Sequence, residues 1–196
     1  MVFFVGLIAY GIVLNLREVT LAEAMKEKGI SRIENVSLVV DRSHYRISLY
    51  SDTTLVKTYK AVFGKNNAKI KTSFDDGATP IGDYKICSFD TNSIYHKFLR
   101  INFPDERDAA EALKNGYIDK EEYDRIYASL ENTGCPPVEK KQGTNIGIHG
   151  IGKFDIIFRN LPFAFNWTNG SIAVSNENID ELYAVTRIGT PVKIKY

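Results

Sequence analysis

The sequence WTNGSIAVSNENIDEL, residues 167–182, decides the fold and the candidate site of this chain. It opens with polar residues and a glycine, continues as an apolar run and then becomes acidic. The apolar run predicts a strand over 170–174, and the acidic part predicts a short helix over 178–185. Because glycine adopts backbone conformations that other residues avoid, Gly170 permits a sharp turn directly before Ser171.

A second segment, IGIHG at residues 146–150, predicts a buried strand that ends in a histidine and a glycine. Gly150 lets the chain turn and lets another backbone approach. A lone histidine in such a place is more often structural than catalytic. We expect His149 to be exposed at the sheet edge, so that His149→Ala costs about 1 kcal/mol of stability or less. His44 and His96 are expected to be ordinary surface residues.

Together these segments resemble the YkuD-type L,D-transpeptidases, which pair a histidine-glycine strand end with a later motif. In one branch the motif reads aromatic, Thr, Asp, Gly, Cys, Ile, Ala, Val, Thr, Asn, followed by an acidic helix. The loop DGATPIG at 76–82 is similar to the family's Gly-x-Thr-Pro-x-Gly stretch, and GTPV at 189–192 to its last turn and strand. The resemblance covers about residues 35–196. The matching motif residues are Trp167, Thr168, Gly170, Ile172, Ala173, Val174 and Asn176.

The resemblance implies acyl transfer between peptidoglycan stem peptides, with no cofactor and no metal. His149 would be the base, with one imidazole nitrogen held by the Gly150 carbonyl and the other facing residue 171. Backbone N–H groups around Gly170 and Ser171 would stabilise the oxyanion. In the family, the donor's acyl group moves to a cysteine and then to an acceptor amine.

Four further residues are candidates for binding substrate: Thr168, Asn169, Trp167 and Thr79. Asn169 stands where the family more often has an acidic residue, a change that affects acceptor recognition. Two of the four have simpler alternatives. Thr79 precedes a proline and fits a turn, and Trp167 fits the core.

Serine at position 171 is the main departure, because the family keeps its nucleophilic cysteine there. A cysteine paired with histidine can rest as a thiolate at neutral pH, whereas serine stays protonated until it attacks. We therefore favour an impaired site, natural or engineered, over a serine acyltransferase with His149 as base. An L,D-carboxypeptidase, in which water replaces the acceptor amine, and a non-catalytic peptidoglycan-binding protein are the alternatives. The resemblance also implies that a Ser171→Cys form is acylated by carbapenems.

Composition excludes several other classes of function. The 196 residues carry a net charge of +1, and no basic patch interleaved with aromatics favours nucleic acid. The two cysteines, Cys87 and Cys135, have no near cysteine or histidine at metal-ligand spacing, which argues against zinc. They either pair in an oxidising compartment or remain buried thiols. We favour free thiols, because the sequence does not place them within bonding distance.

The N-terminus predicts a location in the cell envelope. Residues 2–14 are apolar throughout but fall short of the roughly 20 residues that cross a bilayer upright. We interpret residues 1–16 as a signal or membrane anchor, with a buried strand or helix as the alternative. Residues 17–34 then form a juxtamembrane helix and linker, with helical spacing over 16–28 and Gly29 as its stop.

Residues 35–196 predict one mostly β domain, a curved mixed sheet or sandwich with a helical hairpin inserted at 104–141. The hairpin either caps the cleft or covers a sheet edge. Its helices are expected over 105–114 and 119–130, the second with a capping box. Strands are expected over 37–41, 45–50, 55–63, 83–89, 98–103, 145–149, 170–174 and 191–195.

Overall fold

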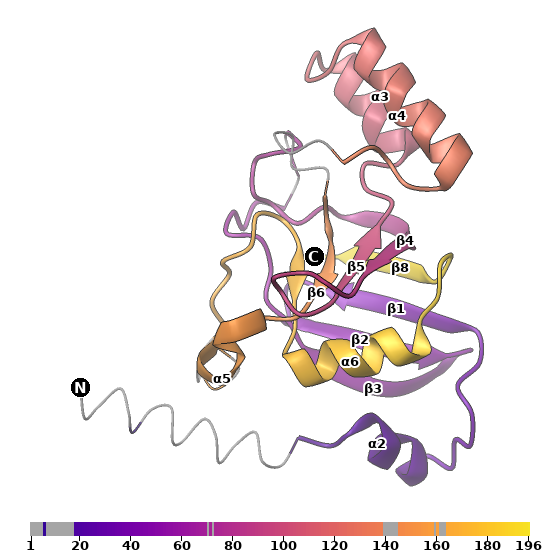
Figure 1. The fold of residues 1–196 in the computed structure, drawn as a ribbon, viewed down its shortest axis with the longest axis vertical. Coiled ribbons are helices and arrows are strands. Elements are labelled where there is room, and N and C mark those ends of the chain that lie inside the picture. Colours follow the sequence, from indigo (N-terminus) through magenta and orange to yellow (C-terminus); the bar gives the residue numbers. More distant parts are fainter. Residues whose placement is uncertain are drawn as a thin grey trace.

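The computed structural model describes Gly6 and residues 18–69, 71, 73–138, 145–158, 160 and 164–196. These residues form one curved, eight-stranded mixed sheet, with a helical hairpin projecting from it (Figure 1). The strand order is β3-β2-β1-β8-β4-β5-β6-β7, which confirms the predicted mostly β fold as a single sheet. The strands are β1 Val36–Asp41, β2 Arg46–Ser51, β3 Thr54–Lys60, β4 Gly82–Asp90, β5 Phe98–Ile101, β6 Gly147–His149, β7 Ile172–Ala173 and β8 Pro191–Lys195.

The sheet curls until its two edges meet. Just after β3, Val62 exchanges two backbone hydrogen bonds with Ala173 of β7, each 2.9 Å long. The pairs β1–β8 and β6–β7 are parallel, and the other neighbours are antiparallel. Gly64 pairs with Thr168, so the loop after β3 lies against the turn that precedes Ser171.

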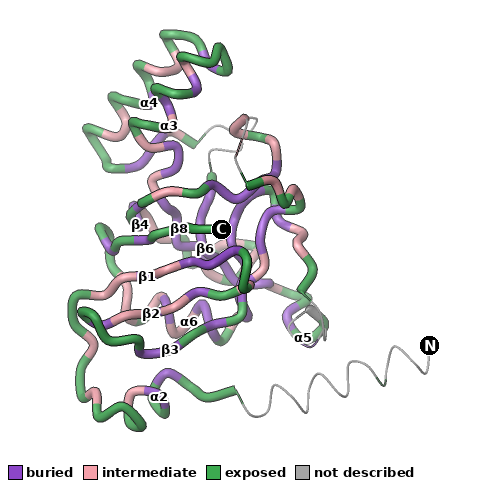
Figure 2. Tube along the Cα trace, turned by 180° about the vertical axis from the view of Figure 1, so that it is seen from behind, coloured by how far each residue is buried: buried purple, intermediate pink, exposed green. Residues whose placement is uncertain are grey.

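The core lies inside the curl, because alternate residues of each strand point inward. Ile47 and Leu49 of β2 and Leu99 of β5 are fully buried. Figure 2 shows buried residues running along the strands, with exposed residues in the loops and hairpin. The helix α6, Asn176–Val185, adds Ile179 and Leu182 to this core. It begins two residues before the helix predicted over 178–185 and ends where predicted.

The inserted hairpin consists of α3, Glu106–Lys114, and α4, Lys120–Thr133. Asp119 caps α4 as predicted, since its side chain accepts a 2.8 Å hydrogen bond from the Glu122 N–H. The two helices bury a small core of their own and stand beyond the ends of β4 and β5 (Figure 1). The members of that core are Ala109, Ala112, Ile118 and Ile126.

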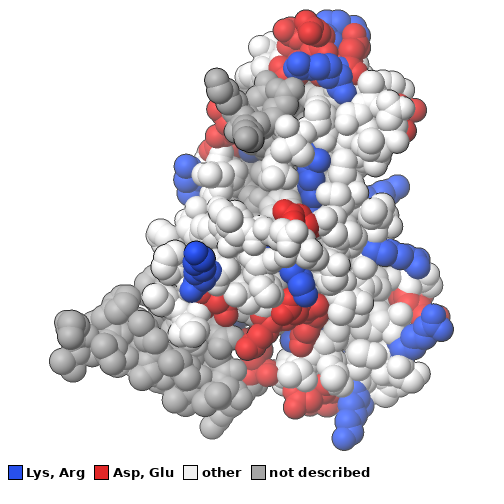
Figure 3. All heavy atoms as spheres, viewed as in Figure 1, with Lys and Arg blue, Asp and Glu red and all other residues white. Residues whose placement is uncertain are grey.

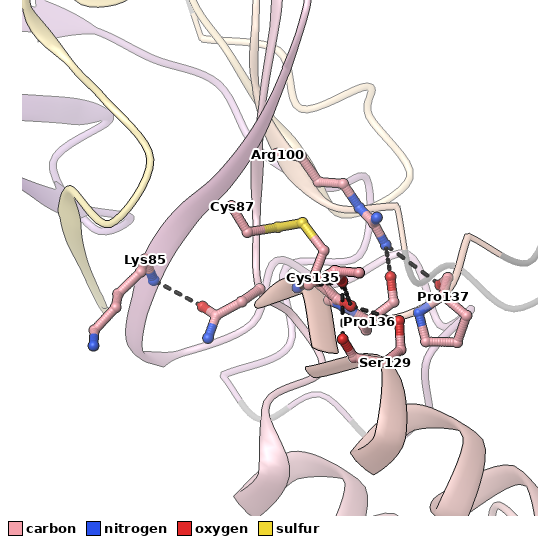
Figure 4. Close-up of a disulfide and its surroundings, with 9 residues drawn as sticks. Lys85, Cys87, Arg100, Ser129, Cys135, Pro136 and Pro137 are labelled. Carbon is pink, nitrogen blue, oxygen red and sulfur yellow. Dashed lines mark hydrogen bonds between the residues drawn. A yellow bond between two sulfur atoms is a disulfide. The ribbon is translucent and has the colours of Figure 1, made fainter. Parts of the chain in front are cut away.

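The two cysteines form a disulfide, so our preference for free thiols was wrong. Cys87 of β4 is bonded to Cys135, which follows the end of α4, with their Cα atoms 5.4 Å apart (Figure 4). The two cysteines are 48 residues apart in the sequence. They meet because the hairpin lies between them and the chain after α4 comes back to β4, the strand that holds Cys87. Local sequence contains no sign of that return.

On the face drawn in Figure 3, side chains of both charge signs are present. The described Lys and Arg side chains lie scattered there, and both signs are present on the hairpin. This distribution agrees with the net charge of +1 and offers no broad basic surface on that face.

The residues before the sheet are attached to the domain. The helix α2, Leu21–Glu27, begins later than the sequence predicted, at a capping box made by Thr20 and Glu23. It buries Leu21 against the core, and the Leu21 N–H donates a 2.8 Å hydrogen bond to Glu181 of α6. The predicted leader, 1–16, lies outside the described residues apart from Gly6. Among the described helices, none has both the length and the apolar character needed to cross a membrane.

Truncation distinguishes the leader from α2. Deleting residues 1–16 should leave a folded protein with unchanged thermal stability. Deleting residues 1–28 should lower the free energy of unfolding by about 2–4 kcal/mol, because it removes the buried Leu21 and Ala24 and uncovers part of β3. Urea titration of both forms measures the difference, and an unfolded first form would place the apolar run in the core.

Candidate active site

The parallel pair β6–β7 brings His149 and Ser171 together. Ile148 pairs with Ile172, so Ser171, directly before β7, lies beside Gly147. Gly147 and His149 share one face of β6, because side chains alternate along a strand. The Gly147 N–H donates a 3.3 Å hydrogen bond to Ser171 Oγ. Adjacent strands therefore bring the two candidate catalytic residues to one end of the sheet.

The imidazole of His149 is held in one tautomer. Its Nδ1 lies 2.6 Å from the Gly150 carbonyl oxygen, which can only accept a hydrogen bond. Nδ1 must therefore carry the proton, and Nε2 is left with a lone pair. Burial lowers the pKa of His149 to about 4, although the Gly150 carbonyl partly opposes the shift. The ring is neutral at physiological pH and is available as a proton acceptor.

His149 is enclosed rather than exposed, so the expectation of an exposed strand-end histidine was wrong. Only 2% of its surface is accessible. The Phe98 ring stacks on it at 5.7 Å between centroids, Tyr95 lies at 4.6 Å and Trp167 meets it edge-on at 5.8 Å. Phe98 is positioned by strand pairing, since it lies opposite His149 in the β5–β6 register. Local sequence contains no sign of the approach of Tyr95, which comes from a loop.

The turn before Ser171 is fastened by Thr168. Its Oγ1 donates a 2.6 Å hydrogen bond to the Ser171 carbonyl and accepts a 3.2 Å bond from the Gly170 N–H. Gly170 has φ +114°, and an added Cβ would lie 2.9 Å from the Ala78 carbonyl oxygen. Glycine is therefore required at this position. The Gly170 N–H that we expected to face an oxyanion is directed to Thr168.

A hollow of about 310 Å³ opens over these residues. Trp167 and the exposed Asn169 line it, as does Val138, which follows the hairpin. The full lining consists of Tyr95, Phe98, Val138, Asn145, Ile146, His149, Trp167, Thr168, Asn169 and Ser171. The structure thus brings most of the predicted site residues to one cavity.

Thr79 does not lie in this hollow. It is fully buried, and its Oγ1 accepts a 2.9 Å hydrogen bond from the Gly64 N–H. Its carbonyl accepts a 2.8 Å bond from the buried Arg42. These contacts agree with the alternative that Thr79 serves a turn, and they fasten the loop that packs behind Gly170. Thr168 is also largely buried, so its main contacts are with the turn.

Asn176 secures the loop that supplies the Gly150 carbonyl. Its side chain accepts from the Gly152 N–H at 2.9 Å and donates to the Gly152 carbonyl at 3.0 Å. Its own N–H donates to Asp155 Oδ1 at 2.9 Å. A Cβ on Gly150 would lie 2.6 Å from Asn176 Oδ1, so the loop can approach only because Gly150 lacks one. The motif identified Asn176, whereas Asp155, in the unpredicted short helix α5 Asp155–Phe158, was missed.

The family profile described as the L,D-transpeptidase catalytic domain, YkuD, matches residues 35–194. The chain belongs to the YkuD family. The match begins immediately before β1 and leaves α2 outside it. No curated protein matches the chain.

Several solved structures are similar to this chain at low sequence identity. Bd1075 of Bdellovibrio bacteriovorus is 18% identical with a TM-score of 0.50, over 83% of this chain and 48% of that one. L,D-transpeptidase 1 of Mycobacterium tuberculosis is 13% identical with a TM-score of 0.44, over 83% and 62%. The helical cell shape determining protein Pgp2 of Campylobacter jejuni is 16% identical with a TM-score of 0.49, over 91% and 56%. The chain therefore spans only about half to three-fifths of these relatives.

The buried His149 predicts an acid-sensitive fold. Its pKa of about 4 lies below the ordinary value of 6.5, so the unfolded chain binds this proton first as the pH falls. Stability should be lost between about pH 6.5 and 4, by about 3 kcal/mol for this one group. Urea titrations of the wild type and of His149→Gln at pH 7 and 4 isolate the effect. A difference between the two proteins that stays the same at both pH values would contradict it.

Proposed function

We propose that this chain is a peptidoglycan L,D-transpeptidase-type acyl-transfer domain that acts outside the cytoplasm, with His149 as base and residue 171 at the nucleophile position. The observation that carries the proposal is the His149–Gly150 hydrogen bond, because it commits Nδ1 as donor and leaves Nε2 as acceptor. Family membership supports the reaction class. Donor and acceptor are both stem peptides of peptidoglycan.

The proposed reaction has two halves. Ser171 Oγ bonds to the donor's carbonyl carbon as its proton passes to Nε2 of His149. The departing amine takes that proton when the C–N bond breaks, which leaves an ester on Ser171. An acceptor amine then attacks the ester and gives a proton to His149, which returns it to the released Oγ. With the Gly170 N–H directed to Thr168, we assign oxyanion stabilisation to the N–H of Ser171.

Serine makes the first half slow. An alcohol must lose its proton during the attack, and a buried imidazole with a pKa of about 4 is a weak base for that task. A thiol, with an ordinary pKa near 8.5, loses its proton far more readily. The Ser171 form therefore binds its donor and turns it over slowly. An L,D-carboxypeptidase shares the acylation half and differs only in its second acceptor, water.

One observation favours a binding role as the second candidate. Ser171 Oγ accepts a hydrogen bond from the Gly147 N–H, so one lone pair of the hydroxyl is already engaged within the sheet. A peptide-binding domain without turnover needs no more than the hollow and its polar rim. The two candidates share a ligand and differ in whether a covalent intermediate forms.

The disulfide supports a location outside the cytoplasm. Disulfides persist in oxidising compartments and are rare where thiols are kept reduced. The Cys87–Cys135 bond therefore agrees with substrates in the cell wall and with residues 1–16 as a signal or anchor.

Mass spectrometry of the Ser171→Cys protein incubated with tetrapeptide-containing muropeptides tests the proposal. An acyl-enzyme together with cross-linked product indicates transpeptidation, and an acyl-enzyme with trimmed product indicates carboxypeptidation. Binding without any covalent adduct would overturn the enzyme proposal in favour of the binding domain.

A further inference from the structure

The segment after α4 runs from the hairpin back to the active-site hollow. Gly134 ends α4 in the left-handed conformation, with φ +72°. The Cys135 carbonyl then accepts hydrogen bonds from Ser129 Oγ at 2.8 Å and Thr133 Oγ1 at 3.1 Å. Three residues later, Val138 lines the same hollow as His149 and Ser171. We refer to residues 135–138 as the return segment.

Two attachments fix the return segment to the sheet (Figure 4). The first is the disulfide from Cys135 to Cys87 of β4. The second is Arg100 of β5, whose Nη2 donates to the Pro136 carbonyl at 2.7 Å and to the Pro137 carbonyl at 3.3 Å. Neither proline has an N–H, so their carbonyls are the backbone groups through which this stretch can be held.

Arg100 is an unusual choice for a purely structural contact. Only 7% of its surface is exposed, and none of the ion pairs between described residues includes it. Burial of a guanidinium is costly, and carbonyl oxygens offset that cost only in part. Val138, the end of the segment so held, is itself 58% exposed and contributes little to the core.

The attachment lies beside the catalytic strand. In the β5–β6 register, Arg100 is opposite Gly147, whose N–H contacts Ser171 Oγ, and Phe98 is opposite His149. Phe98 and Arg100 share one face of β5, because they are two residues apart. Phe98 forms one wall of the hollow, and Arg100 holds the segment that forms another. Arg100 thereby fixes the position of Val138 relative to β5 and β6.

We propose that the Cys87–Cys135 disulfide and Arg100 are positioning residues that hold the return segment as a fixed wall of the hollow, so that reduction of the disulfide weakens substrate binding and leaves the chemical step intact. The inference rests on the proposed function only for the identity of the substrate. Neither residue touches the reacting atoms. Their effect is on the shape of the hollow.

The wall can be tested without any substrate. Trp167 is the only tryptophan of the chain and lines the same hollow, so its fluorescence reports on access to that space. In the full chain, reduction with a phosphine should increase quenching of Trp167 by acrylamide. A Cys87→Ser, Cys135→Ser double variant should show the increased quenching from the start and no response to the phosphine. Unchanged quenching after complete reduction would overturn the proposal, whatever the chain's activity.

Kinetics separate positioning from general loss of structure. In a Ser171→Cys background, Arg100→Met should raise KM for a tetrapeptide muropeptide about tenfold, equal to about 1.4 kcal/mol of lost binding, and leave kcat nearly unchanged. Arg100→Lys keeps a donor and should recover part of KM, and Val138→Ala should raise KM although its side chain adds little to the fold. An effect of Arg100→Met confined to kcat would overturn the assignment. Absence of acylation in every variant, with reduction still changing quenching, would instead reject the proposed function and leave the wall in place.

Discussion

Replacing Ser171 with cysteine should raise the rate of acylation by a carbapenem by orders of magnitude. The surroundings of residue 171 already supply a neutral histidine whose Nε2 carries a lone pair, a hollow and a tight glycine turn. What they lack is a nucleophile of low pKa. Loss of the nucleophile alone leaves binding and oxyanion stabilisation in place, and these still give roughly 10³-fold catalysis in a serine protease. The gain should therefore appear in the acylation rate and not in binding, which calorimetry with the donor peptide follows separately.

A matched thiol controls for nonspecific reaction. Asn169 is exposed and lines the same hollow, so Asn169→Cys places a cysteine near the site without the Gly147 and His149 neighbours of residue 171. Intact mass should show an adduct on the Ser171→Cys protein and none on the Asn169→Cys protein at the same time point. Equal, rapid acylation of the unmodified chain would show a working serine enzyme. A Ser171→Cys protein that stays unmodified would count against the transpeptidase assignment.

The strands and the hairpin were predictable because their signals are local. Alternating residues in β2, the Asp119 cap of α4 and the glycine before Ser171 each act within a few residues of themselves. The ends of some strands differ from the prediction, because pairing with neighbouring strands decides where a strand ends. The strand expected over 145–149 is shorter in the structure. β6 is Gly147–His149, and its register with β5 runs from Phe98 to Arg100, with one further backbone hydrogen bond from the Ile101 N–H to the Ile146 carbonyl.

Local sequence patterns could not predict the contacts that close the sheet and join the cysteines. The sheet closes through Val62 and Ala173, and the disulfide joins Cys87 to Cys135 across the hairpin. Both contacts join residues that are far apart in the sequence. The residues next to them in the sequence carry no signal that predicts either contact. The same holds for the Tyr95 ring over His149. The sequence therefore predicted the candidate pair and one enclosing ring, Trp167, but not Tyr95, Phe98 or Val138.

Enclosure also changes how the base should be tested. If the ring were exposed, His149→Ala would cost about 1 kcal/mol or less. With the ring packed among Tyr95, Phe98 and Trp167, alanine would leave a cavity, and the cost should rise to about 2–4 kcal/mol. Glutamine fills more of the space and cannot act as a base, which makes it the better substitution.

Introduced into the Ser171→Cys protein, His149→Gln should lower the acylation rate at pH 7 by about 10²- to 10⁴-fold, the usual contribution of a general base. The surface histidine His44 provides the control, because His44→Gln should leave the rate unchanged. The pH dependence makes the assignment specific. Without its base, the thiol must ionise unaided, so the residual rate should rise about tenfold per pH unit until it levels off near the ordinary thiol pKa of about 8.5. The protein that retains His149 should acylate well below that pH, because its imidazole stays neutral down to about pH 4. Identical pH profiles for the two proteins would remove His149 from the reaction and confine it to the packing of the hollow.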